Sequence, residues 1–244
     1  MSYFSKPLHI LAKPGDIAER VIVVGDPKRA EILKEFLENP RLVNENRGFY
    51  TYTGLYRGVP LTIAVHGIGA PSAQIVFEEL SMLGAKVIVR FGTAGALVED
   101  LDVGDVILSI SANYYSGGLY YQYTEQPVCI SAVADYNLLK HIEKYMLKHN
   151  VKYTVGSVIS ADRFYIPVKE FIAYWRKFGV KAVEMETAIL YILGAIRGYK
   201  ALSTLLISNS LVKETGYPTA IELKKHVLKI AEPLLEAIST FKDI

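Results

Sequence analysis

Short runs of aliphatic residues alternate along the chain with longer amphipathic segments. Residues 20–24 and 86–92 are continuous apolar runs rich in β-branched residues, which is typical of strands buried in a parallel sheet. Two further strand-like runs, residues 49–56 and 59–66, meet at Arg57-Gly58, a turn signal that predicts a hairpin. The other predicted strands cover residues 105–111, 152–159 and 200–209, and the predicted helices cover residues 27–33, 71–83, 135–149, 169–178, 186–197 and 220–240.

This order of elements predicts an α/β protein. Strands that alternate with helices form a central sheet with helices packed on both faces, and the hairpin adds antiparallel pairing. We therefore predict a three-layer α/β/α sandwich around a mixed β-sheet. Because no linker or internal repeat interrupts the 244 residues, we expect a single domain over residues 1–244.

The composition argues against several classes of protein. Hydrophobic residues make up 51% of the chain, and the formal net charge is only +2 with dispersed basic residues, so nothing indicates a nucleic-acid-binding surface. Cys129 is the only cysteine, which excludes an internal disulfide and a thiolate metal cluster and fits a reducing compartment. No signal-peptide core begins the chain, and no apolar run approaches the roughly 20 residues of a membrane span. We therefore expect a cytoplasmic protein that binds neither nucleic acid nor membrane.

The run Val183-Glu184-Met185-Glu186 places two carboxylates around a thioether, where a buried segment leads into a predicted helix. Carboxylates are rarely buried unless they are paired or take part in chemistry. One interpretation is an ordinary helix N-terminus, where the helix dipole favours Glu; the other is a ligand site. The run alone favours the helix terminus, so the choice depends on what the other strand ends carry.

Two predicted strands end in residues suited to binding an anion. Gly25 allows a ligand to approach the backbone, and Arg29 lies one turn into the following helix. Arg90 stands at the end of a buried strand, where its guanidinium needs an anion and suits phosphate, and Thr93 adds a hydroxyl. The alternatives are a solvated Arg29 after an Asp-Pro turn and a salt bridge between Arg90 and an internal carboxylate.

Two other strand ends carry groups that suit a flat heterocycle. Phe164 follows the strand at residues 152–159 and offers a stacking platform, although a single Phe is more often a core residue. Ser208-Asn209 ends a third strand, and the amide can donate to and accept from the edge of a base. A turn-forming Asn is the alternative at this position.

Six motifs together resemble the nucleoside phosphorylase-I family, and the resemblance covers nearly the whole chain. Each is weak alone, but their order and strand context make a chance match implausible. Within the family, the chain looks most like the hexameric branch of bacterial-type purine nucleoside phosphorylases and archaeal 5′-methylthioadenosine phosphorylases. The motifs are Gly25-Asp26-Pro27-x-Arg29, Asn46-Arg47-Gly48, His66-Gly67-Ile68-Gly69-Ala70-Pro71-Ser72, Arg90-x-Gly92-Thr93-x-Gly95, Ser160-Ala161-Asp162-x-Phe164-Tyr165 and Val183-Glu184-Met185-Glu186.

The resemblance implies a pentosyltransferase that uses phosphate to cleave the N-glycosidic bond of purine nucleosides, with inosine, guanosine, adenosine and 5′-methylthioadenosine as candidate substrates. The products would be free base and ribose 1-phosphate, with inorganic phosphate as co-substrate and neither metal nor cofactor. It also implies a homohexamer with shared active sites, to which His9 and Arg47 come from a neighbouring subunit. The implied phosphate site is Gly25, Arg29, Arg47, Arg90 and Thr93; the nucleoside site is His9, Phe164, Val183, Glu184, Met185, Glu186, Ser208 and Asn209; and the catalytic residues are Arg90, Glu186 and Asn209.

Asn209 departs from the pattern of the hexameric branch, which usually has Ser-Asp here and uses the Asp as a general acid toward the purine N7. An amide cannot deliver a proton and only donates a hydrogen bond, which makes the 6-oxopurines inosine and guanosine plausible. Uridine phosphorylase is an alternative, but residues 166–171 lack the Gln-x-Arg pair that reads uracil. At the 5′ end of the sugar, His9 or the tyrosines at 120, 121 and 123 would contact a hydroxyl or a methylthio group.

Two further classes of function remain open. A nucleoside hydrolase of the same fold uses water, and the arginines at the predicted phosphate site count against it. A non-catalytic nucleoside-binding protein is the other alternative, because the general acid is missing.

Overall fold

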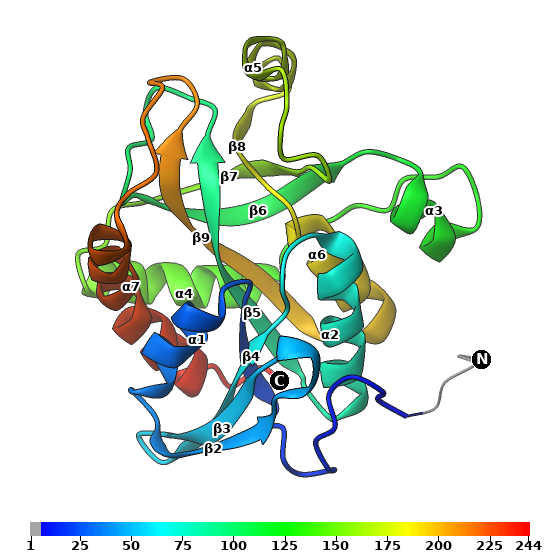
Figure 1. Cartoon of the computed structure of the whole chain (residues 1–244), viewed down its shortest axis with the longest axis vertical. Coiled ribbons are helices and arrows are strands. Elements are labelled where there is room, and N and C mark those ends of the chain that lie inside the picture. Colours follow the sequence, from blue (N-terminus) through cyan, green and yellow to red (C-terminus); the bar gives the residue numbers. More distant parts are fainter. Residues whose placement is uncertain (1–5) are drawn as a thin grey trace.

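The computed structural model describes residues 6–244 and has a central sheet between two helical layers (Figure 1). Its strands are β1 (Arg20–Val24), β2 (Glu38–Asn44), β3 (Thr51–Tyr56), β4 (Val59–Val65), β5 (Val87–Ala96), β6 (Val106–Tyr114), β7 (Tyr153–Ser160), β8 (Val180–Glu184) and β9 (Lys200–Ser210). Its helices are α1 (Pro27–Lys34), the 3₁₀ turn η1 (Asn46–Gly48), α2 (Ala70–Met82), α3 (Gly118–Thr124), α4 (Tyr136–Lys148), α5 (Val168–Arg176), α6 (Thr187–Arg197) and α7 (Ala220–Thr240).

The sheet is mixed, as predicted. Its strand order is β2-β3-β4-β1-β5-β8-β7-β6-β9, with β1 parallel to both β4 and β5 and the hairpin β3–β4 antiparallel. β9 pairs with β5 as well as with β6, so β5, β8, β7, β6 and β9 join into a ring. The ring brings the ends of β5, β8 and β9 to one place.

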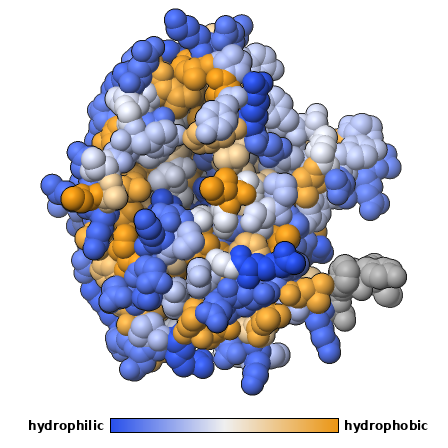
Figure 2. Space-filling view, viewed as in Figure 1, coloured by the Kyte–Doolittle hydropathy of each residue, from blue (hydrophilic) through white to orange (hydrophobic). Residues whose placement is uncertain are grey.

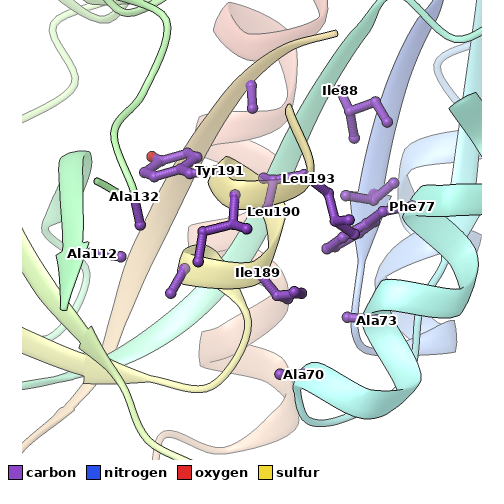
Figure 3. Close-up of a cluster of buried hydrophobic side chains, with 14 of the residues drawn as sticks. Ala70, Ala73, Phe77, Ile88, Ala112, Ala132, Ile189, Leu190, Tyr191 and Leu193 are labelled. Atoms are coloured by element: carbon purple, nitrogen blue, oxygen red, sulfur yellow. The ribbon is translucent and has the colours of Figure 1, made fainter. Parts of the chain in front are cut away.

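The helices form the two outer layers, which confirms the predicted α/β/α class. Helices α1, α4 and α7 cover one face of the sheet, and α2 and α6 cover the other (Figure 1). Residues 187–194 of α6 are all buried, as expected for a helix that is apolar on every side. Phe77 of α2, Ile88 of β5 and Leu193 of α6 belong to one buried cluster (Figure 3).

Three elements were missed from the sequence, and the structure gives the reason for each. β2 is a mostly exposed edge strand that contains Pro40 and shifts register twice against β3, so it lacks the apolar alternation of a strand. β8 is only five residues long and leads almost directly into α6. α3 begins after Gly117 and contains a single buried residue, Tyr120, which leaves no helical stripe to detect.

The pairing of strand ends assembles the predicted site residues. In the parallel pair of β1 and β5, Val23 lies opposite Arg90, so the loop after β1 follows directly beside this arginine. Gly95 of β5 pairs with Val183 of β8 on one side and with Asn209 of β9 on the other. Chain segments more than a hundred residues apart therefore converge at the ends of the strands, where ligands bind in open α/β sheets.

Candidate active site

A cavity of about 900 Å³ opens where these strand ends meet. The face drawn in Figure 2 is hollowed near its centre, and hydrophobic side chains lie at the edge of the hollow. A cavity of this size accommodates a small organic ligand. Its lining includes Gly25, Arg29, Arg90, Thr93, Phe164, Val183, Glu184, Met185, Glu186, Ser208 and Asn209, which are all the predicted site residues except His9 and Arg47.

Arg90 lies between the two carboxylates of the Val183–Glu186 run. Its Nη1 is 3.0 Å from Glu184 Oε2, and its Nη2 donates to Glu186 Oε2. The salt-bridge alternative for Arg90 is therefore realised in the structure. Its Nε and Nη1 nevertheless make no hydrogen bond, so this buried guanidinium keeps donors for a further anion. A Cβ at Gly92 would collide with the Arg90 guanidinium, which explains the glycine in the Arg-x-Gly-Thr motif.

Glu184 is both a helix cap and a partner of the arginine. Its Oε2 accepts hydrogen bonds from the backbone N–H groups of Glu186 and Thr187, at 2.8 and 2.9 Å, at the start of α6. Its Oε1 accepts from the Ser160 hydroxyl, which itself accepts from the Ala188 N–H at 2.8 Å. These bonds fix the carboxylate, so the helix-terminus interpretation of the run is also correct for Glu184.

Glu186 joins three elements at the floor of the cavity. Its Oε1 accepts from the Gly69 N–H at 2.6 Å at the start of α2, while Oε2 accepts from Arg90 of β5. Burial raises the pKa of Glu186, while the charge of Arg90 acts in the opposite direction. A carboxylate has about four acceptor positions, so two remain for further hydrogen bonds.

Arg29 is a buried cation without a carboxylate partner. It is only 5% exposed, its Nη1 donates to the Phe91 carbonyl at 2.9 Å, and its guanidinium lies 5.5 Å from the centre of the Phe91 ring. Within residues 6–244, no Asp or Glu forms an ion pair with it, and its Nε has no partner. Burial lowers the pKa of Arg29 to about 10, so the group stays charged at neutral pH. A buried charge of this kind requires an anion.

The lining of the cavity also includes apolar side chains and one free amide. Phe164 and Met185 line it, and Phe164 is 57% exposed, as a stacking platform must be. The Ser208 hydroxyl donates to Asn209 Oδ1 at 3.1 Å. The Asn209 Nδ2 makes no hydrogen bond to any described residue, so its N–H groups are available to a ligand.

His9 and Arg47 lie outside this cavity but close to each other. The side chain of Asn46, the residue before Arg47, donates to the His9 carbonyl at 3.0 Å. Arg47 is exposed, has the positive φ of 56°, and forms no ion pair with a described residue. The tyrosines considered for the 5′ end also lie elsewhere: Tyr120 is buried in the core, and Tyr123 binds Gln74 at 2.8 Å. None of the tyrosines at 120, 121 and 123 lines the cavity.

Several lining residues were not identified from the sequence. Ile68 and the backbone of Gly67 stood in a recognised motif, but no role was assigned to them. Leu211 and Tyr217 belong to the loop after β9, which carries no local signal and reaches the cavity only through the fold. Arg163 and Tyr165 flank Phe164 and were passed over because their exposure could not be judged from the sequence.

Residues 6–244 contain neither a metal-binding cluster nor a membrane-spanning helix. These residues contain no group of three or more His, Cys, Asp or Glu side chains placed to hold a metal ion. Over the same part of the chain, no helix has the length and apolar character needed to cross a membrane.

The match to a known family and to named relatives identifies the chain as a phosphorylase. Residues 19–240 match the family model of the phosphorylase superfamily, and the chain belongs to that superfamily, as predicted. A purine nucleoside phosphorylase of the DeoD type from Clostridium perfringens is 39% identical over 237 residues, which cover 96% of this chain and 99% of the relative. A protein of the same name from Xenorhabdus nematophila is 35% identical and is matched over 94% and 96% of the two chains.

Solved structures agree with this assignment. Purine nucleoside phosphorylase from Toxoplasma gondii in complex with immucillin-H superimposes with a TM-score of 0.87 at 26% identity, over 98% of this chain and 97% of the other. Uridine phosphorylase from Vibrio fischeri superimposes with a TM-score of 0.85 at 31% identity, over 96% of each chain. The fold is therefore common to purine and pyrimidine enzymes, and the choice of base depends on the residues of the site.

Proposed function

We propose that the chain cleaves the N-glycosidic bond of purine nucleosides with inorganic phosphate, releasing the free base and ribose 1-phosphate. It is a nucleoside phosphorylase whose relatives are named for purine nucleosides. The single observation that carries the use of phosphate is Arg29, a buried cation at the cavity with no carboxylate partner among the described residues. A hydrolase that activates water has no use for this charge.

The proposed mechanism follows from where charge develops. Cleavage of a glycosidic bond passes through a cationic, oxocarbenium-like sugar, while negative charge builds up on the departing base. Arg29, Arg90 and Thr93 would hold the attacking phosphate, together with the backbone at Gly25. Glu186 would accept hydrogen bonds from the sugar hydroxyls and stabilise the positive charge. No cofactor is needed for this displacement.

The base would lie against the apolar side chains that line the cavity. There Phe164 offers a stacking surface, Met185 packs beneath the sugar, and Val183, Glu184 and Ser208 complete the wall. Asn209 would donate from Nδ2 to the purine N7, an orientation supported by the hydrogen bond that Ser208 donates to Oδ1. Among residues 6–244, the carboxylates that line the cavity are Asp26, Glu184 and Glu186, and the last two bind Arg90. Without a general acid near the base, 6-oxopurines are the preferred substrates.

His9 and Arg47 would act in the active site of a neighbouring copy. The hydrogen bond from Asn46 to the His9 carbonyl joins the segments that carry the two residues, and neither residue lines the cavity of its own chain. An exposed arginine without an ion pair is suited to complete a phosphate site across an interface. We propose a homohexamer in the cytoplasm, in which Arg47 reaches the phosphate and His9 the 5′ end of the sugar.

Phosphate dependence tests the proposed function directly. With inosine, guanosine, adenosine, 5′-methylthioadenosine and uridine, we expect release of a purine base only when phosphate is present, with ribose 1-phosphate or its 5′-methylthio analogue as the second product. Base release without phosphate would establish a hydrolase. Faster turnover of uridine than of any purine nucleoside would establish a uridine phosphorylase, and tight binding without turnover would establish a binding protein.

Replacement of the amide tests the role at N7. Asn209→Asp restores a group that can carry a proton, so the ratio of kcat/KM for adenosine to that for inosine should rise by about a hundredfold, the lower end of the range for general acid catalysis. Asn209→Ala, which removes the amide but adds no acid, is the control and should not raise the ratio. An unchanged ratio in Asn209→Asp would show that the side chain does not contact the leaving base.

A further inference from the structure

Glu79 holds the segment that carries His9, although it lies outside the cavity. This residue of α2 is 6% exposed, and its carboxylate accepts hydrogen bonds from three consecutive backbone N–H groups of the segment. The shortest distances are 3.0 Å from Leu8, 2.9 Å from His9 and 2.6 Å from Ile10. No Lys or Arg within residues 6–244 forms an ion pair with Glu79. Among these residues, the hydrogen-bond donors to its carboxylate all belong to the segment.

The same carboxylate also binds the His9 ring. His9 Nδ1 lies 2.7 Å from Glu79 Oε1. Burial alone would raise the pKa of Glu79, but the hydrogen bonds from Ile10, His9 and Leu8 outweigh it and hold the pKa below its ordinary value. An ionised carboxylate can only accept, so Nδ1 carries the proton. Nε2 is then the ring nitrogen left for a ligand.

The other side of the segment is fixed as well. Ile10 is fully buried in the core, and the Leu11 N–H donates to Asn44 Oδ1 at 2.9 Å. Together with the bond from Asn46 to the His9 carbonyl, this joins the segment to the turn that carries Arg47. His9 keeps 26% of its side chain exposed, and Nε2 makes no hydrogen bond to a described residue. The ring is therefore rigid, half-buried and open on its Nε2 side.

We infer that Glu79 is a positioning residue that, by holding His9 Nδ1, directs Nε2 toward the 5′ position of the nucleoside and selects for a 5′-hydroxyl. This inference rests on the proposed function, in which His9 meets the sugar bound by a neighbouring copy. A hydroxyl can both donate to and accept from a ring nitrogen, whereas a methylthio sulfur, a fluorine or a methyl group cannot donate and is at best a weak acceptor. The Glu79–His9 pair thus decides between ordinary nucleosides and those modified at the 5′ carbon.

The native enzyme provides the first test, which no folding defect can obscure. Its kcat/KM for inosine should exceed that for 5′-deoxy-5′-fluoroinosine by about tenfold, the worth of one hydrogen bond, and the difference should lie in KM. Fluorine is close to a hydroxyl in size and differs in being unable to donate. Equal kcat/KM values for the two substrates would overturn the inference, because the ring would then make no hydrogen bond to the 5′-hydroxyl.

The second test removes the carboxylate. In Glu79→Gln, one amide oxygen must replace two carboxylate oxygens as the acceptor for the backbone N–H groups and for the His9 ring, so the ring is no longer held. The preference for inosine over the 5′-fluoro substrate should then fall to about threefold or less. In a His9→Phe background, the same change should leave the preference unaltered. Equal losses for both substrates in Glu79→Gln would indicate a purely structural role and overturn the inference, as would an undiminished preference.

A neighbouring glutamate supplies the matched control. Glu78 precedes Glu79 on α2 but binds Arg197, with contacts of 2.6 and 2.8 Å, and has no contact with His9. Glu78→Gln should keep the native preference for inosine. Failure of the proposed function is recognised separately, because the native enzyme would then release no base from inosine with phosphate, whereas failure of this inference leaves that reaction intact and changes only the 5′ preference.

Discussion

Arg29→Met should abolish most phosphorolysis while leaving the protein as stable as before. We expect kcat/KM for phosphate to fall by about 10²- to 10³-fold, the usual loss when a positioned donor to a reacting anion is removed. The melting temperature should stay within about 3 °C of the native value, because the lost hydrogen bond to the Phe91 carbonyl is offset by relief of a buried charge. Methionine keeps most of the length of the side chain and fills the same space.

A neighbouring basic residue controls for a general effect of charge. Lys28 stands beside Arg29 on α1 but is exposed and does not line the cavity. Lys28→Met should leave the KM for phosphate within about twofold of the native value, since an exposed charge is screened by solvent. If Arg29→Met retained a near-native KM for phosphate, the buried guanidinium would not be part of the phosphate site.

The contrast between Arg29 and Arg90 shows what local sequence can and cannot predict. Both were identified because each follows a buried β-branched run, and strand ends of this kind gather at one edge of a sheet. Which of the two pairs with carboxylates depends on β8, a five-residue strand that brings Glu184 to Arg90 across 94 positions of sequence. That pairing is a property of the fold, so the sequence left phosphate and salt bridge as equal alternatives for Arg90.

The same reasoning applies to the elements. The strands β1, β5 and β9 were predictable because a fully buried strand leaves a continuous apolar run, and the amphipathic helices because one buried face leaves a helical period. The ring closure between β9 and β5 was not, because both are continuous apolar runs that reveal no partner. Glu79 was overlooked for a related reason: on α2 it is one of two adjacent glutamates, and only its contact with residue 9, 70 positions away, distinguishes it from its neighbour.

The Val183–Glu186 run therefore has a double role, in which neither initial interpretation displaces the other. Glu184 caps α6 and holds Arg90, which in turn holds Glu186 at the cavity. The pairing also limits Arg90, because a guanidinium held by two carboxylates has less charge to offer a phosphate than the unpaired Arg29. We expect the two arginines to differ more in their effect on stability than in their effect on catalysis.

Arg90→Met should accordingly impair both catalysis and stability. Catalysis should fall at least as far as in Arg29→Met, because the variant loses a phosphate donor and the partner that orients Glu186. Two buried carboxylates are left without their cation, which costs about 3–5 kcal/mol. For a chain of this size, about 1 kcal/mol corresponds to about 2–4 °C, so the melting temperature should drop by roughly 6–20 °C.

The pH dependence of this loss identifies its cause. Burial already raises the pKa of Glu186 above its ordinary value of 4.5, and Arg90 opposes this effect, so removing Arg90 should raise the pKa further. A carboxyl whose pKa is higher in the folded state binds more protons there, and its contribution to stability is present below the ordinary pKa and lost as pH rises through the folded-state pKa. The difference in melting temperature between the native protein and Arg90→Met should thus be smaller at about pH 5 than at about pH 8.

Arg90→Met/Glu186→Gln completes the test. The added Gln removes one uncompensated charge while keeping an oxygen for the Gly69 N–H, so the melting temperature should recover by several degrees and lose most of its pH dependence. Phosphorolysis should stay as low as in the single variant, because neither the phosphate donor nor the carboxylate is restored. The opposite result would be a loss of melting temperature that is the same at both pH values and is not reduced in the double variant. It would show that Arg90 stabilises the fold by packing and not by balancing the buried charge of Glu186.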